Sequence, residues 1–150
     1  MLSIADLAWT AGIIDGEGSI FVMKQKRDDR DRDTNYILRV SVQSTDPYMT
    51  SQLKEMFPEG AEFSVRRDPR ENCSDTLKWQ LSGKKAARFL KEIIPFMRVK
   101  TEQARLAIEF QTSTKKHWRH MTPEDYEKQE QMYFALKQAK IDLKIGKEVR

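Results

Sequence analysis

The chain has 150 residues, of which 39% are hydrophobic and 33% are charged. A chain of this length can bury a core without disulfides or a structural metal, and we expect one domain over residues 1–150. It carries 27 Lys and Arg against 23 Asp and Glu, a net charge of +4, which is too small an excess to establish a polyanionic partner. Cys73 is the only cysteine, so an intrachain disulfide and a zinc site built on several cysteines are excluded.

The sequence shows no sign of a membrane or secretory segment. No apolar run approaches the roughly 18 residues that a membrane-spanning helix needs. Residues 1–6 carry no basic side chain before the first apolar stretch, which argues against a signal peptide. We therefore expect an intracellular protein without a membrane partner.

A helix is expected first, because Ser3 followed by Asp6 is a capping pattern and glycines at 16 and 18 end the helix near Asp15. Apolar residues form one stripe along it: Ile4, Leu7, Ala11 and Ile14. Small residues and an acid form a second stripe: Ala5, Ala8, Gly12 and Asp15. A single amphipathic helix needs only the first stripe, and the second is suited to close approach of another helix.

Alternating polarity then predicts strands over 19–25, 36–44, 62–67 and 76–82. Between the second and third strands, Asp46 and Pro47 begin a helix. Further helices begin at Ser82, near Thr101 and at Thr122. The order α-β-β-α-β-β-α, followed by two more helices, predicts an α+β fold with an antiparallel sheet that is open on one face.

The two faces of this sheet are expected to differ in character. The residues predicted to face the core are Leu38, Val40, Val42, Phe63, Val65, Leu77, Trp79 and Leu81. The residues predicted on the open face are Arg39, Ser41, Gln43, Ser64, Arg66, Lys78 and Gln80. Side chains of this kind read base edges in a DNA major groove, but any solvated sheet face is polar, and periodicity alone leaves both interpretations open.

Two segments resemble one protein family. Residues 10–19, TAGIIDGEGS, resemble the signature of the LAGLIDADG homing endonucleases. Residues 95–104, PFMRVKTEQA, resemble the segment that carries the active-site lysine in the single-motif members. The strand and helix order between them also fits, and the resemblance covers roughly residues 4–112.

The resemblance implies both a fold and an activity. The fold is αββαββα with additional C-terminal helices and a saddle-shaped sheet that binds double-stranded DNA. The activity is site-specific cleavage of both strands by a homodimer, at a long near-palindromic site, leaving 3′ overhangs. Hydrolysis would depend on Mg²⁺, with Mn²⁺ as a possible substitute, and would serve intron homing.

Glu17 and Gly16 are the expected metal ligands. A carboxylate at a helix end, with a backbone carbonyl as a second ligand, suits a hard cation, and the C-terminal end of the helix dipole favours positive charge. The other interpretation of Glu17 is a surface acid in a turn. The family usually has Asp at this position, and the additional methylene of Glu could shift the metal geometry.

The resemblance assigns catalytic roles to Lys100 and Asp46 as well as to Glu17. Lys100 would stabilise charge that develops at the scissile phosphate, although an ordinary exposed lysine before a helix is the other interpretation. Asp46 would lie near the attacking water, and its position before Pro47 also makes it a helix N-cap. The family often has a basic residue four positions after Asp46, where this chain has Thr50.

The stripe of small residues predicts a dimer contact. A chain with one motif has one copy of the motif helix, so the resemblance implies that two chains pair through Ala8 and Gly12. Asp15 would cap and lock the paired helices. The other interpretation is that this stripe packs on the chain's own helices.

Recognition of DNA is assigned to the open face of the sheet. The predicted DNA-binding residues are Met23, Gln25, Arg39, Ser41, Gln43, Ser64, Arg66, Arg70, Lys78 and Gln80. Arginine and lysine suit guanine, and glutamine suits adenine. The basic run 115–120 could contact phosphates or form a solvated loop.

Two other functional classes remain open. One is a nucleic-acid-binding protein that does not cleave, such as a maturase acting on intron RNA or a DNA-binding regulator. The other is a structural or protein-interaction domain in which the motif is a coincidence. The presence of both Glu17 and Lys100 favours the endonuclease.

Overall fold

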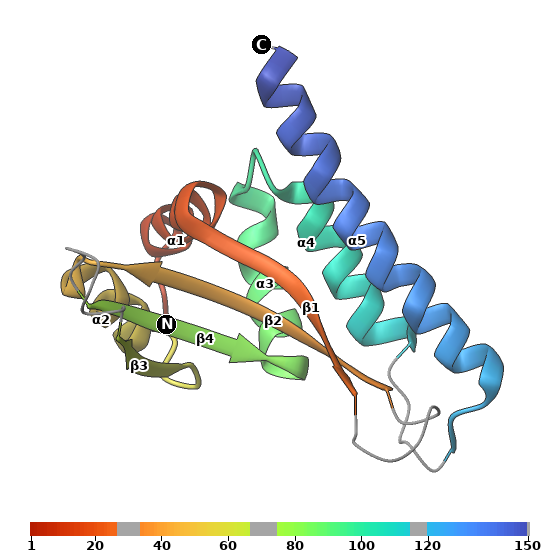
Figure 1. The fold of residues 1–150 in the computed structure, drawn as a ribbon. Helices are drawn as coiled ribbons and strands as arrows, with labels where there is room; N and C mark the ends of the chain where they lie inside the picture. The colour runs from red at the N-terminus through yellow and green to blue at the C-terminus, as the bar shows by residue number, and fades with distance from the viewer. Residues whose placement is uncertain (27–33, 67–74, 115–119, 150) are drawn as a thin grey trace.

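An antiparallel sheet with the strand order β1-β2-β4-β3 forms the centre of the fold. The computed structural model describes residues 1–26, 34–66, 75–114 and 120–149 (Figure 1). Its elements are α1 (Ile4–Glu17), β1 (Gly18–Lys26), β2 (Thr34–Ser44), α2 (Pro47–Met56), β3 (Ala61–Val65), β4 (Thr76–Ser82), α3 (Gly83–Ile93), η1 (Ile94–Phe96), α4 (Thr101–Glu109), η2 (Phe110–Thr114) and α5 (Pro123–Val149). The predicted α+β class and element order are confirmed. None of the described helices combines the length and apolarity that a membrane span requires.

Two of the predicted helix caps form and one does not. The Ser3 hydroxyl accepts a hydrogen bond from the backbone N–H of Asp6 at 3.1 Å, and the Asp6 carboxylate accepts one from the N–H of Ser3 at 3.0 Å. The Asp46 carboxylate accepts from the N–H of Tyr48 at 2.9 Å at the start of α2. Ser82 precedes α3 but makes no side-chain capping bond. Gly83 begins α3 with φ of 62°, which glycine adopts without strain.

One face of the sheet carries the core. Leu38, Val40 and Val42 of β2 are fully buried, as is Trp79 of β4, and the register pairs Val42 with Trp79 and Val40 with Leu81. These residues form one apolar cluster with side chains from the helices, and α3 passes behind the strands in Figure 1. The opposite face of the sheet therefore remains available for function.

The orientation predicted for β3 is wrong. The register pairs Phe63 with Lys78 and Ser64 with Leu77, and directly paired residues point to the same face of a sheet. Phe63 therefore lies on the open face, where 42% of it is exposed, and Ser64 lies on the helix side. A one-residue shift in an alternating pattern exchanges the faces of every residue in the strand.

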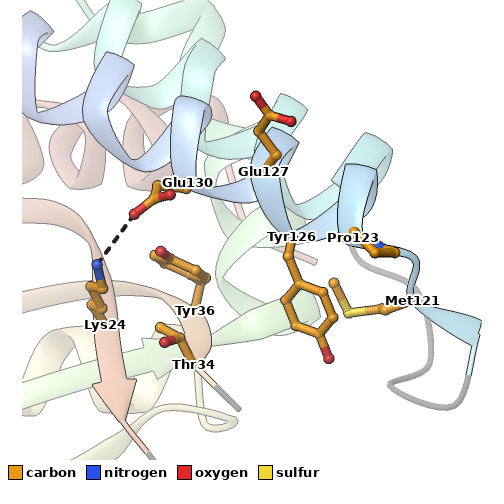
Figure 2. A pocket seen from close by; sticks show the side chains of 8 residues that line it. All are labelled: Lys24, Thr34, Tyr36, Met121, Pro123, Tyr126, Glu127 and Glu130. Atoms are coloured by element: carbon orange, nitrogen blue, oxygen red, sulfur yellow. Dashed lines mark hydrogen bonds and ion pairs between the residues drawn. The ribbon is translucent and has the colours of Figure 1, made fainter. Parts of the chain in front are cut away.

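The long helix α5 lies alongside the edge strand β1. Lys24 of β1 forms an ion pair with Glu130 of α5, with 3.4 Å between Nζ and Oε1. Tyr36 of β2 packs against Tyr133 of α5 with ring centroids 5.5 Å apart. Figure 2 shows Lys24, Tyr36 and Glu130 beside a cavity of about 610 Å³. Burial first, and the Glu130 carboxylate second, raise the pKa of the Tyr36 phenol.

The turn between α2 and β3 depends on close packing of Gly60 against Trp79. A methyl group at Gly60 would lie 2.7 Å from Cε2 of the buried indole. We expect Gly60→Ala to lower the free energy of unfolding by about 1–3 kcal/mol, because the core must shift to accept the methyl group. Urea unfolding measures the change.

Gly146→Ala is the matched control, because nothing lies within 4 Å of a methyl group at this position in α5. Alanine should raise helix stability there by at most about 1 kcal/mol. Equal stability of the two variants would contradict the packing described for Gly60.

Candidate functional site

The site begins where α1 meets β1. Glu17 is the last residue of α1, and both Glu17 and Gly16 are exposed. Gly18 begins β1 and is buried against the preceding helical turn, where a methyl group would lie 2.7 Å from Cα of Ile14. This close approach allows the chain to leave the helix directly into the strand. As a result, the Glu17 carboxylate and the Gly16 backbone stand at the exposed end of the helix.

Asp15 connects this junction to a distant segment of the chain. Its carboxylate accepts hydrogen bonds from the backbone N–H groups of Arg98, Val99 and Lys100, at 2.8, 3.2 and 3.0 Å. Three donors directed at one carboxylate fix the loop that precedes α4. Asp15 therefore positions the backbone that carries Lys100.

The side chain of Lys100 closes the same site. Its Nζ donates hydrogen bonds to the carbonyl oxygens of Ile14, at 3.1 Å, and Gly18, at 2.5 Å. An ammonium group is favourable there because the carbonyls at the end of a helix carry partial negative charge. Glu17 and Lys100, distant in sequence, therefore belong to the same helix end.

Asp46 lies at the end of the β1–β2 ladder where α1 enters β1. Gly18 pairs with Val42, and β2 ends two residues later at Ser44. The Ser44 hydroxyl accepts a hydrogen bond from the backbone N–H of Asp46 at 3.0 Å, and the Asp46 carboxylate caps α2. Thr50 is fully buried within α2, and its hydroxyl donates to the carbonyl of Pro47 at 3.3 Å. Thr50 therefore contributes no charged group to the site.

The donor set at this junction fits a hard cation only in part. Among the described residues, no group of three His, Cys, Asp or Glu side chains is arranged to hold a metal ion. The exposed Glu17 carboxylate and the Gly16 carbonyl supply oxygen ligands of the type that Mg²⁺ prefers. Mg²⁺ commonly takes one or two carboxylates and completes its shell with waters and substrate phosphates. The junction is suited to that mode and not to a site built from protein ligands alone.

The sequence analysis missed two further lysines at this junction. A cavity of about 260 Å³ is lined by Gly18, Ser19, Lys100, Gln103, Lys140, Leu143 and Lys144. Burial first, and the charge of Lys100 second, lower the pKa of the Lys140 ammonium. The only sequence signal was the spacing of the two lysines, which places Lys140 and Lys144 on one face of a helix.

The sheet places most of the predicted DNA-binding residues on its open face. The register puts these residues on that face: Met23, Gln25, Arg39, Ser41, Gln43, Lys78 and Gln80. Ser64 is on the helix side, Arg66 follows the end of β3, and Arg70 lies outside the described residues. Phe63 was not predicted there, because its strand was assigned the opposite orientation.

Local contacts restrict some of these side chains. Gln43 Nε2 donates a hydrogen bond to the Thr76 hydroxyl at 2.6 Å, so the orientation of its amide is set before any ligand arrives. Ser41 is buried despite its position on the open face. The Nε of Arg39 is also buried and has no hydrogen-bond partner among the described residues. Lys78 and Gln80 are partly exposed.

The stripe of small residues on α1 does not pack on the chain's own helices. Ala5, Ala8 and Gly12 are exposed, and nothing in the described chain lies within 4 Å of a methyl group placed at Gly12. Two large apolar residues, Ile4 and Trp9, are 73% and 40% exposed on the same helix. Asp15 shares the stripe, but its carboxylate bonds to residues of its own chain. The interpretation of an internal packing surface is therefore wrong.

Comparison with solved structures identifies the fold. The homing endonuclease I-CvuI, in a complex with the I-CreI target, aligns over 91% of this chain and 85% of its own, with a TM-score of 0.74 and 15% identity. The archaeal intron-encoded homing endonuclease I-Vdi141I, complexed with DNA, aligns over 90% and 84%, with a TM-score of 0.73 and 17% identity. The chain has the LAGLIDADG homing endonuclease fold. No family model and no curated protein matches the sequence.

Longer proteins with the LAGLIDADG fold align to this chain over less than half of their length. The meganuclease I-SmaMI, bound to uncleavable DNA, aligns over 87% of this chain but 44% of its own, with a TM-score of 0.63 and 18% identity. This chain therefore corresponds to one fold unit of such a protein. The fold that the sequence resemblance implied is confirmed.

The Asp15 contacts yield a prediction about stability. We expect Asp15→Asn to lower the free energy of unfolding by about 1–3 kcal/mol, because an amide presents one acceptor oxygen where the carboxylate presented two. Urea unfolding of the purified chain measures this loss. Asp46→Asn is the control, because asparagine caps a helix as well as aspartate does. An Asp15→Asn variant as stable as this control would show that the three hydrogen bonds contribute little.

Proposed function

We propose that the chain is a site-specific DNA endonuclease that acts as a homodimer. The observation that carries this proposal is that Lys100 Nζ binds backbone carbonyls at the end of α1, the helix whose last residue is Glu17. The solved structures with this fold include homing endonucleases bound to DNA, which supports DNA as the substrate. The proposed sites are long and near-palindromic, and cleavage leaves 3′ overhangs.

Each residue of the junction has a proposed role in phosphodiester hydrolysis. Glu17 and the Gly16 carbonyl hold Mg²⁺, or Mn²⁺ in its place, which when bound neutralises phosphate charge and orients the reacting oxygens. Lys100 stabilises the negative charge that develops on the phosphate. Asp46, at the same end of the ladder, orients the attacking water while it caps α2. Asp15 keeps the Lys100 backbone in position.

The exposed stripe on α1 is the proposed dimer contact. Ala8 and Gly12 have no bulky side chain, so two copies of α1 can approach closely about a two-fold axis. Such pairing also covers Ile4 and Trp9, which are exposed in the single chain. It brings together the two Glu17 residues, one for each DNA strand.

The open face of the sheet is the proposed DNA-reading surface. One sheet from each protomer would lie in a major groove, with half-site centres about 10 bp apart. Lys78 suits guanine and Gln80 suits adenine. The exposed ring of Phe63 suits contact with a thymine methyl group, which extends the predicted set of base-reading residues.

Substitution of Glu17 tests the cleavage chemistry. The wild-type protein and Glu17→Gln are incubated with a randomised duplex library in Mg²⁺ and, separately, in Ca²⁺. We expect the wild type to cut a near-palindromic site in Mg²⁺. Glu17→Gln should cut the same site roughly 10²–10³-fold more slowly, because it loses the charged oxygen ligand, and should still bind the duplex in Ca²⁺.

Glu92→Gln is the matched control, since Glu92 is an exposed acid of α3 and should cut at the wild-type rate. Selective binding by the wild type without cutting in Mg²⁺ would contradict the endonuclease. That result would favour a DNA-binding regulator, and preference for intron RNA over duplex DNA would favour a maturase.

A charged substitution in α1 tests the dimer. Gly12→Glu should leave the fold intact, since the position is open, but should place bulk and charge between the paired helices. We expect a monomer by analytical ultracentrifugation and loss of double-strand cleavage. Gly146→Glu makes the same change at another open position and should remain dimeric. A Gly12→Glu variant that still forms dimers would place the interface elsewhere.

A further inference from the structure

A cluster of three lysines surrounds the cavity beside the proposed cleavage site. Lys100 comes from the turn before α4, and Lys140 and Lys144 come from α5. The described residues that line this cavity include no acidic side chain. Gly18 and Ser19, the first residues of β1, form another part of its wall. The cavity therefore adjoins the peptide segment that presents Glu17.

The packing of α5 along β1 brings the two additional lysines to this point. Contacts between α5 and β1 extend from the Lys24–Glu130 ion pair to the cavity at Gly18 and Lys144. At about 1.5 Å per residue, the helix advances about 21 Å from Glu130 to Lys144. At about 3.3 Å per residue, the strand advances about 20 Å from Lys24 to Gly18. The two lengths nearly agree, and the contacts at both ends show that the two elements run side by side in opposite directions.

The ammonium of Lys140 is held in place by its surroundings. Its Nζ lies 5.4 Å from the centroid of the Phe21 ring, a distance typical of a cation–π contact. Among the side chains described between residues 1 and 146, no carboxylate forms an ion pair with Lys140 or Lys144. Burial first, and the neighbouring Lys100 second, disfavour the charge of Lys140 and lower its pKa. An anion in the cavity would relieve that repulsion.

We propose that Lys140 and Lys144 bind a backbone phosphate of the DNA adjacent to the scissile bond. This inference rests on the proposed endonuclease function and adds α5 to the DNA-binding surface. The cavity offers room for a phosphate group, and three lysines line it.

The salt dependence of DNA binding tests the phosphate contact. Affinity for the selected duplex is measured in Ca²⁺ over a series of salt concentrations, for the wild type and Lys140→Met. Methionine keeps an apolar stem against Phe21 and removes the charge. Each lost phosphate contact lowers the slope of log K against log salt by about 0.9. With one contact per protomer, we expect the slope to fall by about 2 for the dimer.

Two variants separate charge from packing. Lys140→Arg should restore the wild-type slope, because it keeps the positive charge. Lys128→Met removes an exposed lysine near the other end of α5 and should leave the slope unchanged. A slope for Lys140→Met equal to that of the wild type, even with slower cleavage, would overturn the phosphate contact and leave Lys140 a structural role.

Two further observations distinguish the possible failures. If the wild type binds no duplex, the proposed function itself fails. If the wild type binds and only the slope of Lys140→Met is unchanged, the phosphate subsite alone fails. Calorimetric titration with inorganic phosphate in the absence of DNA is the last measurement. We expect no binding. Tight binding of phosphate, together with an unchanged salt slope for DNA binding by Lys140→Met, would assign the cavity to a free anion.

Discussion

The three hydrogen bonds that the Asp15 carboxylate accepts from residues 98–100 join the two halves of the candidate site. One partner is the last turn of α1, and the other is the turn before α4, more than eighty residues later. Without this connection, Lys100 would have no fixed relation to Glu17. The Lys100 ammonium adds a second connection, because it binds the carbonyls of Ile14 in α1 and Gly18 at the start of β1. The site therefore depends on one partly buried connection, beside which Gly16 and Glu17 stand exposed.

Local signals were sufficient to predict most of the fold. The capping pattern of Ser3 and Asp6 begins α1, and the alternation in β2 matches its fully buried apolar residues. The prediction failed for β3, which has five residues and lies at the edge of the sheet. So short a pattern does not define its own faces, and only the pairing with β4 shows that Phe63 lies on the open side.

The site could be predicted only as far as its motifs extend. Glu17 and Lys100 were found because each lies in a segment that resembles a known family, and Asp46 because the resemblance extends over the elements between those segments. Lys140 could not be found in this way, because its position depends on how α5 docks along β1. That docking is specified by contacts such as Lys24 with Glu130, and neither residue carries a local signal for its partner. The periodicity of a helix indicates which face is buried but not which strand it covers.

The position of α5 also affects how the chain behaves towards other chains. A sheet with one uncovered face still has two edges, and an unprotected edge strand can pair with another chain and start aggregation. Along β1, the helix contacts the strand at Lys24, at Phe21 and around Gly18. At the other edge, β3 is short, which limits the number of hydrogen bonds it could offer to an incoming strand. The sheet can therefore keep its broad face open while its edges give little opportunity for self-association.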